Sequence, residues 1–138
     1  MKLKFGFTLL ELIVVIIIIG ILATLGFIQY TSVIEKGRKA EARANLGTLR
    51  TLEKAYYEDT ASVGGTGAYS DLLNLASGLP TANCATTHYF LYNCVSGTGS
   101  CSATRCSTGG KPPNIAAASA YTITLSIDGA FTGGGQWQ

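Results

Sequence analysis

Two residues near the start of the chain could support proteolysis and charge pairing. Gly6 follows a short basic segment that contains Lys2 and Lys4, and glycine is small enough for a protease pocket to accept beside the bond it cuts. Glu11 is the only charge in the apolar run 7–28. A carboxylate in a membrane span costs up to about 2.5–3.5 kcal/mol at the centre and less near the edge. These residues predict cleavage at Gly6 and a cationic partner for Glu11.

The apolar run 7–28 predicts a membrane-spanning helix. At about 1.5 Å per residue it would be about 33 Å long, which is enough to cross the hydrocarbon core of a bilayer. A secretory signal peptide carries its apolar region before the cleavage site, whereas here the run follows Gly6. The span would therefore stay on the mature chain. Gly20 and Gly26 interrupt it, at a spacing wider than the usual small-residue dimer motif.

The stretch Gly6-Phe7-Thr8-Leu9-Leu10-Glu11 resembles the class III signal of type IV prepilins and of type II secretion pseudopilins. The resemblance covers roughly residues 1–57. It implies that a prepilin peptidase cuts between Gly6 and Phe7 on the cytoplasmic face and that Phe7 is N-methylated. It also implies that mature subunits polymerise into a helical filament whose core is the bundle of apolar helices.

Cleavage would also explain the charge of Glu11. It creates an α-amino cation at Phe7, and methylation leaves that amine cationic. In a filament the amine of one subunit would pair with Glu11 of a neighbour, so that each buried charge is neutralised only on assembly. Two alternatives are that Glu11 reaches the lipid headgroups, or that it pairs with its own Phe7 amine one helical turn away.

The charge balance argues against a nucleic-acid binder. The chain has 10 Lys and Arg against 8 Asp and Glu, and removal of Lys2 and Lys4 leaves 8 of each. A neutral mature chain lacks the basic excess typical of such proteins. Positive residues flank the span on both sides, and their count alone points weakly to an N-terminus outside the cytoplasm. The resemblance implies the opposite orientation, and the four cysteines, all beyond the span, suit an oxidising compartment.

Residues 29–57 predict a continuation of the same helix in amphipathic form. Mixed charges with opposite pairs such as Glu35 and Lys39 are typical of a solvated helix face. An apolar stripe follows, which another element must cover: it consists of Leu46, Leu49, Leu52 and Tyr56. A helix from Phe7 to Tyr57 would be about 77 Å long. Many pilins carry a proline near the position of Ile28, and its absence here leaves the place of any bend open.

The remaining residues, 58–138, predict a small β-rich head. Three glycines within 64–67 favour a loop after the helix, and Ser70 could cap a short helix over 70–76. Strands are predicted at 88–94, 101–106 and 121–127, with a hairpin turn at Asp128-Gly129 and a returning strand at 130–132. The predicted fold is α+β, with a long N-terminal helix packed on a small antiparallel sheet, which is the lollipop architecture that the resemblance implies.

The sequence therefore divides into four predicted parts. Residues 1–6 form a cleaved leader, 7–28 the transmembrane and filament-core half of the helix, 29–57 its amphipathic half, and 58–138 the globular head.

Four cysteines in the head predict two disulfides, worth about 2–4 kcal/mol each. Four cysteines allow three pairings. Cys94 and Cys101 flank a glycine turn and could close it, which would leave Cys84 with Cys106, but the sequence does not decide between the pairings. A metal site that combines the cysteines with His88 is the alternative, although no Cys-x2-Cys pair is present.

Other residues with chemical potential are better explained as structural. His88 is predicted to lie at the start of a strand. Asp128 is predicted to be a turn residue, although the resemblance implies calcium in this region for some major pseudopilins. The aromatic residues would pack in the core or between subunits, since Arg105 and Lys111 are the only basic residues after Lys54. These aromatics are Tyr56, Tyr57, Tyr69, Tyr89, Tyr92, Tyr121 and Trp137.

The function predicted from these features is that of a structural filament subunit and not of an enzyme, without a cofactor or metal. Its partners would be copies of itself, the prepilin peptidase and methyltransferase, and the inner-membrane assembly machinery. The precursor would lie in the bacterial inner membrane with its head outside the cytoplasm, and the mature chain in a pilus at the cell surface or in the periplasm. The alternatives are a type II secretion pseudopilin, or a minor pilin whose head binds DNA or a surface.

Overall fold

The structure is a computed structural model, which describes residues 6–70 and 78–135. The chain divides into two compact units, residues 1–36 and residues 37–138, and each is described by itself. The long helix α1, Leu9–Ser62, contributes to both units.

Helix α1 begins two residues later than predicted because Thr8 caps it. The backbone N–H of Glu11 donates to Thr8 Oγ1 at 3.3 Å, and the N–H of Leu12 donates to the Thr8 carbonyl at 3.3 Å. Thr8 therefore occupies the N-cap position, and Phe7 lies outside the helix. From Leu9 onward the helix is continuous through the described glycines.

Helix α1 also ends later than predicted, at Ser62 instead of Tyr57. No helix-breaking residue occurs between these positions, and the first glycine beyond them is Gly64. Its backbone φ is +88° and its N–H donates to the Ala61 carbonyl at 3.3 Å. A left-handed glycine just beyond the last turn is a common way to close a helix, so Gly64 sets the end.

Between Phe7 and Leu25, the large apolar side chains are exposed. The exposed fractions from Phe7 to Leu25 run from 43% for Ile13 to 78% for Phe7. By length and composition, α1 is long and apolar enough to cross a membrane near the N-terminus. This surface is much more apolar than a monomer in water usually exposes in one patch.

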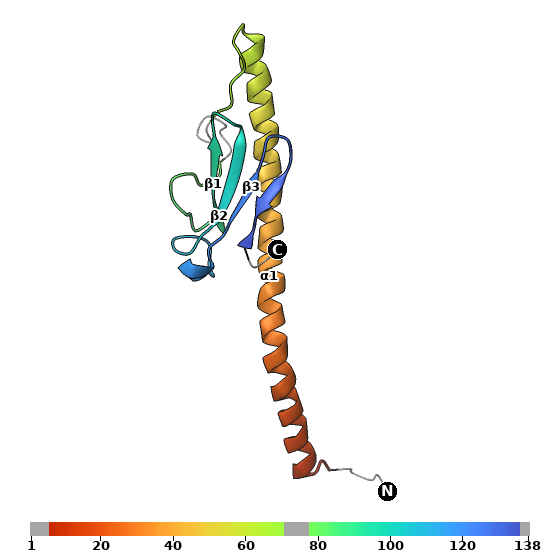
Figure 1. The fold of residues 1–138 in the computed structure, drawn as a ribbon. Coiled ribbons are helices and arrows are strands. Elements are labelled where there is room, and N and C mark those ends of the chain that lie inside the picture. The colour runs from red at the N-terminus through yellow and green to blue at the C-terminus, as the bar shows by residue number, and fades with distance from the viewer. Residues whose placement is uncertain (1–5, 71–77, 136–138) are drawn as a thin grey trace. The chain divides into compact units, whose positions relative to one another are not determined.

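Within residues 37–138, four antiparallel strands form one sheet in the order β1-β2-β3-β4 (Figure 1). The strands are β1 Phe90–Val95, β2 Ser100–Arg105, β3 Thr122–Leu125 and β4 Phe131–Gly133. A short 3-10 helix, η1 Ala117–Ser119, lies between β2 and β3. Each predicted strand is therefore present, with ends shifted by up to two residues.

The hairpin predicted at Asp128-Gly129 joins β3 to β4. The N–H of Gly129 donates to the Ser126 carbonyl at 2.9 Å, and the N–H of Ser126 donates to the Ala130 carbonyl at 3.0 Å. Gly129 has φ +102°, a value that L side chains rarely adopt. The turn therefore depends on glycine at this position.

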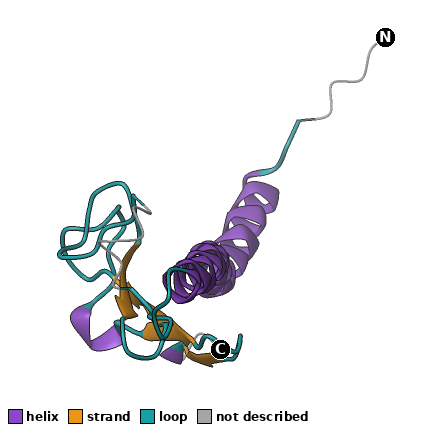
Figure 2. Cartoon of the chain, turned by 90° about the horizontal axis from the view of Figure 1, so that it is seen from above, coloured by secondary structure: helices purple, strands orange, loops and turns teal. Residues whose placement is uncertain are grey.

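The sheet packs on one side of α1 and buries a single core (Figure 2). Side chains that alternate along the strands face the helix, and the buried apolar residues are Ala42, Leu46, Leu49, Phe90, Tyr92, Cys94, Cys101, Ala103, Tyr121, Ile123 and Leu125. The α+β fold predicted from the sequence is confirmed, with α1 packed on a four-stranded antiparallel sheet.

The buried stripe of α1 is rotated from the predicted one. Leu46 and Leu49 are fully buried, but the stripe continues to Glu53, which is 0% exposed, while Leu52 and Tyr56 are only half-buried. Repeated steps of three residues drift around a helix with 3.6 residues per turn, whereas steps of three and four stay on one face. The prediction followed apolar residues and therefore missed a carboxylate in the core.

The predicted solvated face is also partly wrong. Glu35 and Lys39 are only 3% and 5% exposed. The predicted short helix over 70–76 lies outside the described residues except for Ser70, as does Trp137.

Candidate functional site

The predicted cleavage site lies before α1, in an exposed segment. Gly6 and Phe7 are both exposed, and the helix starts only at Leu9. A peptide bond must be extended and accessible to enter a protease site, and a bond inside a helix is neither. The Gly6–Phe7 bond is exposed and lies outside the helix.

Thr8 and Glu11 form a capping arrangement that the sequence analysis overlooked. The pattern Thr-x-x-Glu is the capping-box signature, and here the Glu11 N–H donates to Thr8 Oγ1. The cap fixes Glu11 in the first turn, where the positive end of the helix dipole favours a carboxylate. The signal was visible in the sequence, because Thr8 stands three residues before Glu11.

The cap weakens the alternative in which Glu11 pairs with the Phe7 amine of the same chain. That alternative assumed that Phe7 and Glu11 are separated by one helical turn. Because Phe7 lies outside the helix, α1 does not set that spacing.

Two disulfides join the four cysteines. Cys94 pairs with Cys101 across the β1–β2 hairpin, where the two residues are direct partners in the strand register. Cys84 pairs with Cys106, at a sequence separation of 22. The second bond ties the segment before β1 to the residue after β2, so it encloses the hairpin that the first bond joins.

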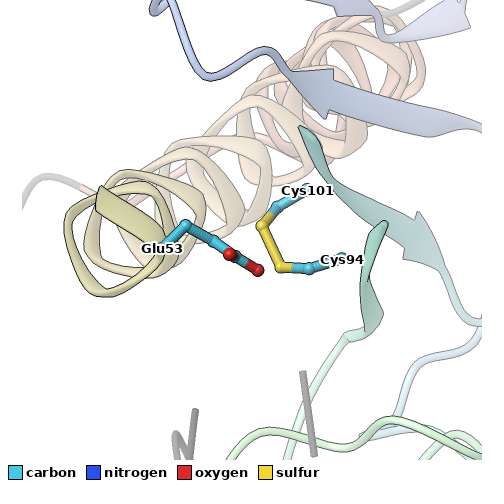
Figure 3. Close-up of side chains that lie close together, drawn as sticks. All are labelled: Glu53, Cys94 and Cys101. Carbon is cyan, nitrogen blue, oxygen red and sulfur yellow. A yellow bond between two sulfur atoms is a disulfide. The ribbon is translucent and has the colours of Figure 1, made fainter. Parts of the chain in front are cut away.

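Glu53 points from α1 at the Cys94–Cys101 bond (Figure 3). One carboxylate oxygen and the two sulfur atoms lie within 4.8 Å of one another, and all three residues are buried. Among the described residues this is the group with metal-ligand geometry, and it does not contain His88. Both sulfurs are in a disulfide, so neither offers a thiolate to a metal ion.

Arg105 has a structural role that its sequence position did not reveal. It is 1% exposed. Its guanidinium donates to the carbonyls of Tyr89 at 3.0 Å, Cys106 at 3.3 Å and Pro113 at 3.0 Å. A planar group with five donors can hold several carbonyls at once, so Arg105 fixes the segments on either side of it.

Tyr89 is surrounded by three cationic side chains. The ring centroid lies 4.7 Å from Arg38 Cζ, 5.0 Å from Lys111 Nζ and 5.3 Å from Arg105 Cζ. Such distances are typical of cation–π contacts. We call Tyr89, Arg38, Arg105 and Lys111 the Tyr89 basic cluster. The sequence alone does not reveal this cluster, because Arg38 comes from α1 and is far from Tyr89 along the chain.

The other aromatic residues divide between core and surface. Tyr92 and Tyr121 are buried, while Tyr57 stacks on Tyr69 with ring centroids 4.8 Å apart. His88 lies before β1 with Nδ1 2.8 Å from Thr87 Oγ1, and Asp128 is exposed in the β3–β4 turn.

Comparison with known proteins gives one family and two relatives. Residues 1–27 match the prokaryotic N-terminal methylation motif. The type IV major pilin protein PilA of Myxococcus xanthus is 35% identical over 69 residues, which cover 50% of this chain and 29% of the relative. A probable minor fimbrial protein of Dichelobacter nodosus is 35% identical over 65 residues, covering 46% of this chain and 41% of the relative. No solved structure matches the chain.

The chain thus spans less than half the length of both relatives. The N-terminal methylation motif and the similarity to two pilus proteins agree with the resemblance seen at Gly6 to Glu11. By name, the two relatives are a pilin and a fimbrial protein.

Proposed function

We propose that this chain is a structural subunit of a type IV pilus or a related filament, made as a membrane-inserted precursor. The observation that carries the proposal is the exposed Gly6–Phe7 bond directly before a capped helix, which has one carboxylate in its first turn and exposed apolar side chains as far as Leu25. The N-terminal methylation motif and the two pilus relatives support the same role.

The proposed mechanism begins with hydrolysis of the Gly6–Phe7 amide by the prepilin peptidase. The new α-amine of Phe7 is cationic, and it remains so after one methyl group is added. In the bilayer, the charge of Glu11 is unfavourable because lipid tails offer it no counter-charge. Packing of apolar helices into a bundle brings the amine of one copy to Glu11 of another, and both charges are then neutralised.

The apolar side chains of α1 supply the packing in this mechanism. Between Phe7 and Leu25 every described large apolar residue is exposed, so this surface is available to lipid in the precursor and to other copies in a filament. Association inside a membrane relies on close packing and on interhelical polar contacts, both of which this helix offers. The mature filament would carry its heads outside the cytoplasm, where disulfides persist.

The intact mass of the chain purified from its own membranes or from sheared filaments tests the proposal. We expect the mass of residues 7–138 plus one methyl group, less the four hydrogens lost in two disulfides. A bulky residue at Gly6 should leave the precursor uncut, while Gly6→Ala should be cut normally or slightly less. A wild-type chain of unprocessed mass would overturn the proposed function.

A type II secretion pseudopilin is the second candidate, since both classes share the N-terminal motif. The similarity to a major pilin and to a fimbrial protein favours the pilus. Recovery of the chain from filaments sheared off the cell surface supports a pilus, whereas filaments confined to the periplasm support a pseudopilus.

A further inference from the structure

The group formed by Glu53, Cys94 and Cys101 combines the ligand types of a zinc site. One carboxylate oxygen and both sulfur atoms lie within 4.8 Å of one another, and all three residues are buried. Zinc binds thiolates at about 2.3 Å and carboxylate oxygens at about 2.0–2.2 Å, so a tetrahedral ion holds such ligand atoms about 3.5–3.8 Å apart. Small rotations of the three side chains therefore bring them to one ion when the cysteines are thiols.

The cysteines are thiols in every newly made chain. Thiols are kept reduced in the cytoplasm, and disulfides form and persist in an oxidising compartment. Cys94 and Cys101 are direct partners in the β1–β2 register. Side chains directly opposite one another lie on the same face of a sheet, with Cβ atoms about 4.5–5.5 Å apart. The strand pairing thus keeps the two sulfur atoms side by side before a bond joins them.

Glu53 is directed at the two sulfur atoms by the structure around it. It lies on the buried face of α1, and its Oε2 atom accepts a hydrogen bond from the backbone N–H of Ser70 at 2.9 Å. Figure 3 shows the carboxylate pointing at the sulfurs. Metal ligands are commonly oriented by such hydrogen bonds from surrounding groups. A disulfide offers a carboxylate neither a proton nor a charge, whereas a zinc ion held by two thiolates offers it a bond and a positive charge.

The second cysteine pair differs from the first in this respect. Across residues 6–70 and 78–135, no carboxylate or imidazole is grouped with Cys84 and Cys106 as Glu53 is with the first pair. Cys84 is also only half-buried. The second pair therefore serves as an internal control for the chemistry of the first.

We propose that Glu53, Cys94 and Cys101 bind one zinc ion in the reduced chain, before the disulfide forms. Binding releases the two thiol protons, and the three residues supply three of the four ligands that zinc usually takes. A thiol–disulfide oxidant then removes two electrons from the thiolates. Its own disulfide takes up these electrons with two protons and leaves as two thiols, while the bond between Cys94 and Cys101 forms and the zinc ion is released.

The bound ion would favour the native disulfide pairing. Four thiols can pair in three ways. A zinc ion on Cys94 and Cys101 withholds these two thiolates from an oxidant, so that Cys84 and Cys106 pair first. The first pair is then left with its native partner only.

Cobalt titration of the full chain in mild detergent, reduced with a phosphine, tests the site. Cobalt substitutes for zinc, and its bonds to thiolates absorb in the near ultraviolet, so the intensity of this band reports the thiolate ligands. We expect one cobalt ion per chain with two thiolate ligands, displaced by zinc. The oxidised chain should show no such band. A reduced wild-type chain that lacks the band overturns the proposal.

Variants identify the ligands. Glu53→Gln should weaken zinc binding at least about tenfold, because the charged ligand is lost while the amide oxygen still accepts from the Ser70 N–H. Glu41→Gln, at an exposed position of the same helix, is the matched control and should bind as wild type. C94S/C101S should lose the band, whereas C84S/C106S should keep it. Binding that Glu53→Gln leaves unchanged, or that persists in C94S/C101S, overturns the site.

Reoxidation tests the role of the ion in pairing. The reduced chain is oxidised with glutathione disulfide in the presence of zinc or of a chelator, and peptide mapping counts the pairings. Zinc should lower the mispaired share by at least about half in the wild type, and this effect should be absent from Glu53→Gln, since random pairing is native in about one case in three. Equal shares with zinc and with chelator exclude a role in pairing. Both tests use the unassembled chain, so their outcome is independent of whether filaments form.

Discussion

Glu53 accepts a hydrogen bond at its Oε2 atom from the backbone N–H of Ser70, with a donor–acceptor distance of 2.9 Å. Both residues are buried. The carboxylate thus connects α1 to the chain that follows the loop 63–69, while the same side chain also faces the Cys94–Cys101 bond. One buried acid therefore helps to organise three segments of the head.

Loss of this carboxylate should destabilise the head. We expect Glu53→Ala to lower the free energy of unfolding by about 1.5–3 kcal/mol, because the buried Ser70 N–H loses an acceptor that carries charge. Denaturant unfolding of the full chain in mild detergent, followed by near-UV circular dichroism, measures the change. Glu41→Ala, at an exposed position of the same helix, is the control and should shift stability by less than about 0.5 kcal/mol. Equal effects of the two substitutions would argue against this role of Glu53.

The carboxylate should also protect the neighbouring disulfide from reduction. Attack by a thiolate releases a second thiolate beside Glu53, and a nearby negative charge disfavours both anions. We expect Glu53→Gln to speed the reduction of Cys94–Cys101 about three- to tenfold, and to leave Cys84–Cys106 nearly unchanged. Timed alkylation and peptide mapping after addition of a dithiol report the two bonds separately. A parallel acceleration of both bonds would indicate general loosening of the head instead.

Much of the fold could be predicted because local patterns determine it. The apolar run 7–28 and the stripe through Leu46 and Leu49 indicated a long helix. Alternation along Tyr121, Ile123 and Leu125, followed by Asp128-Gly129, indicated a strand and its hairpin. Each of these sequence patterns lies within the helix, strand or turn that it indicates, and does not depend on residues elsewhere in the chain.

The rest could not be predicted because it depends on residues that are distant in the sequence. Glu53 resembles any charged residue of a solvated helix until the hairpin that covers it is known. Arg38 reaches Tyr89 only after the sheet packs on α1. Arg105 is the last residue of β2. The face of the sheet on which its side chain lies depends on the register of the paired strands.

Titration of the Tyr92 hydroxyl should make the free energy of unfolding depend on pH. Burial raises its pKa above the usual value, and the repulsion of Glu41 adds to this, while the hydrogen bond from Asn45 lowers it. Neutral Tyr92 therefore contributes stability that is complete below the unfolded pKa of about 10 and is lost as pH rises through the higher folded value. We expect wild type to lose stability relative to Tyr92→Phe as the pH rises above about 10, in denaturant unfolding at a series of pH values. A difference that stays constant over this range would contradict the assignment.

A double-mutant cycle separates the hydrogen bond from burial. Asn45 Nδ2 donates to Tyr92 Oη at 2.8 Å. We expect a coupling energy of about 0.5–1.5 kcal/mol between Asn45→Ala and Tyr92→Phe near pH 7.

The final prediction concerns Glu11 and separates assembly from insertion and processing. Glu11→Ala removes the carboxylate but keeps the exposed Gly6–Phe7 bond and leaves Thr8 Oγ1 available to the backbone N–H of residue 11. We therefore expect a chain that inserts in the membrane and is cleaved and methylated, with the same intact mass as the wild type apart from the substitution. Filament yield should fall at least tenfold, because the Phe7 amine of each subunit then enters the apolar bundle without a counter-charge. Glu11→Asp, which retains a shorter carboxylate, should recover part of the yield. Normal assembly of the alanine variant would exclude charge pairing from the proposed mechanism and leave apolar packing as the sole driving force.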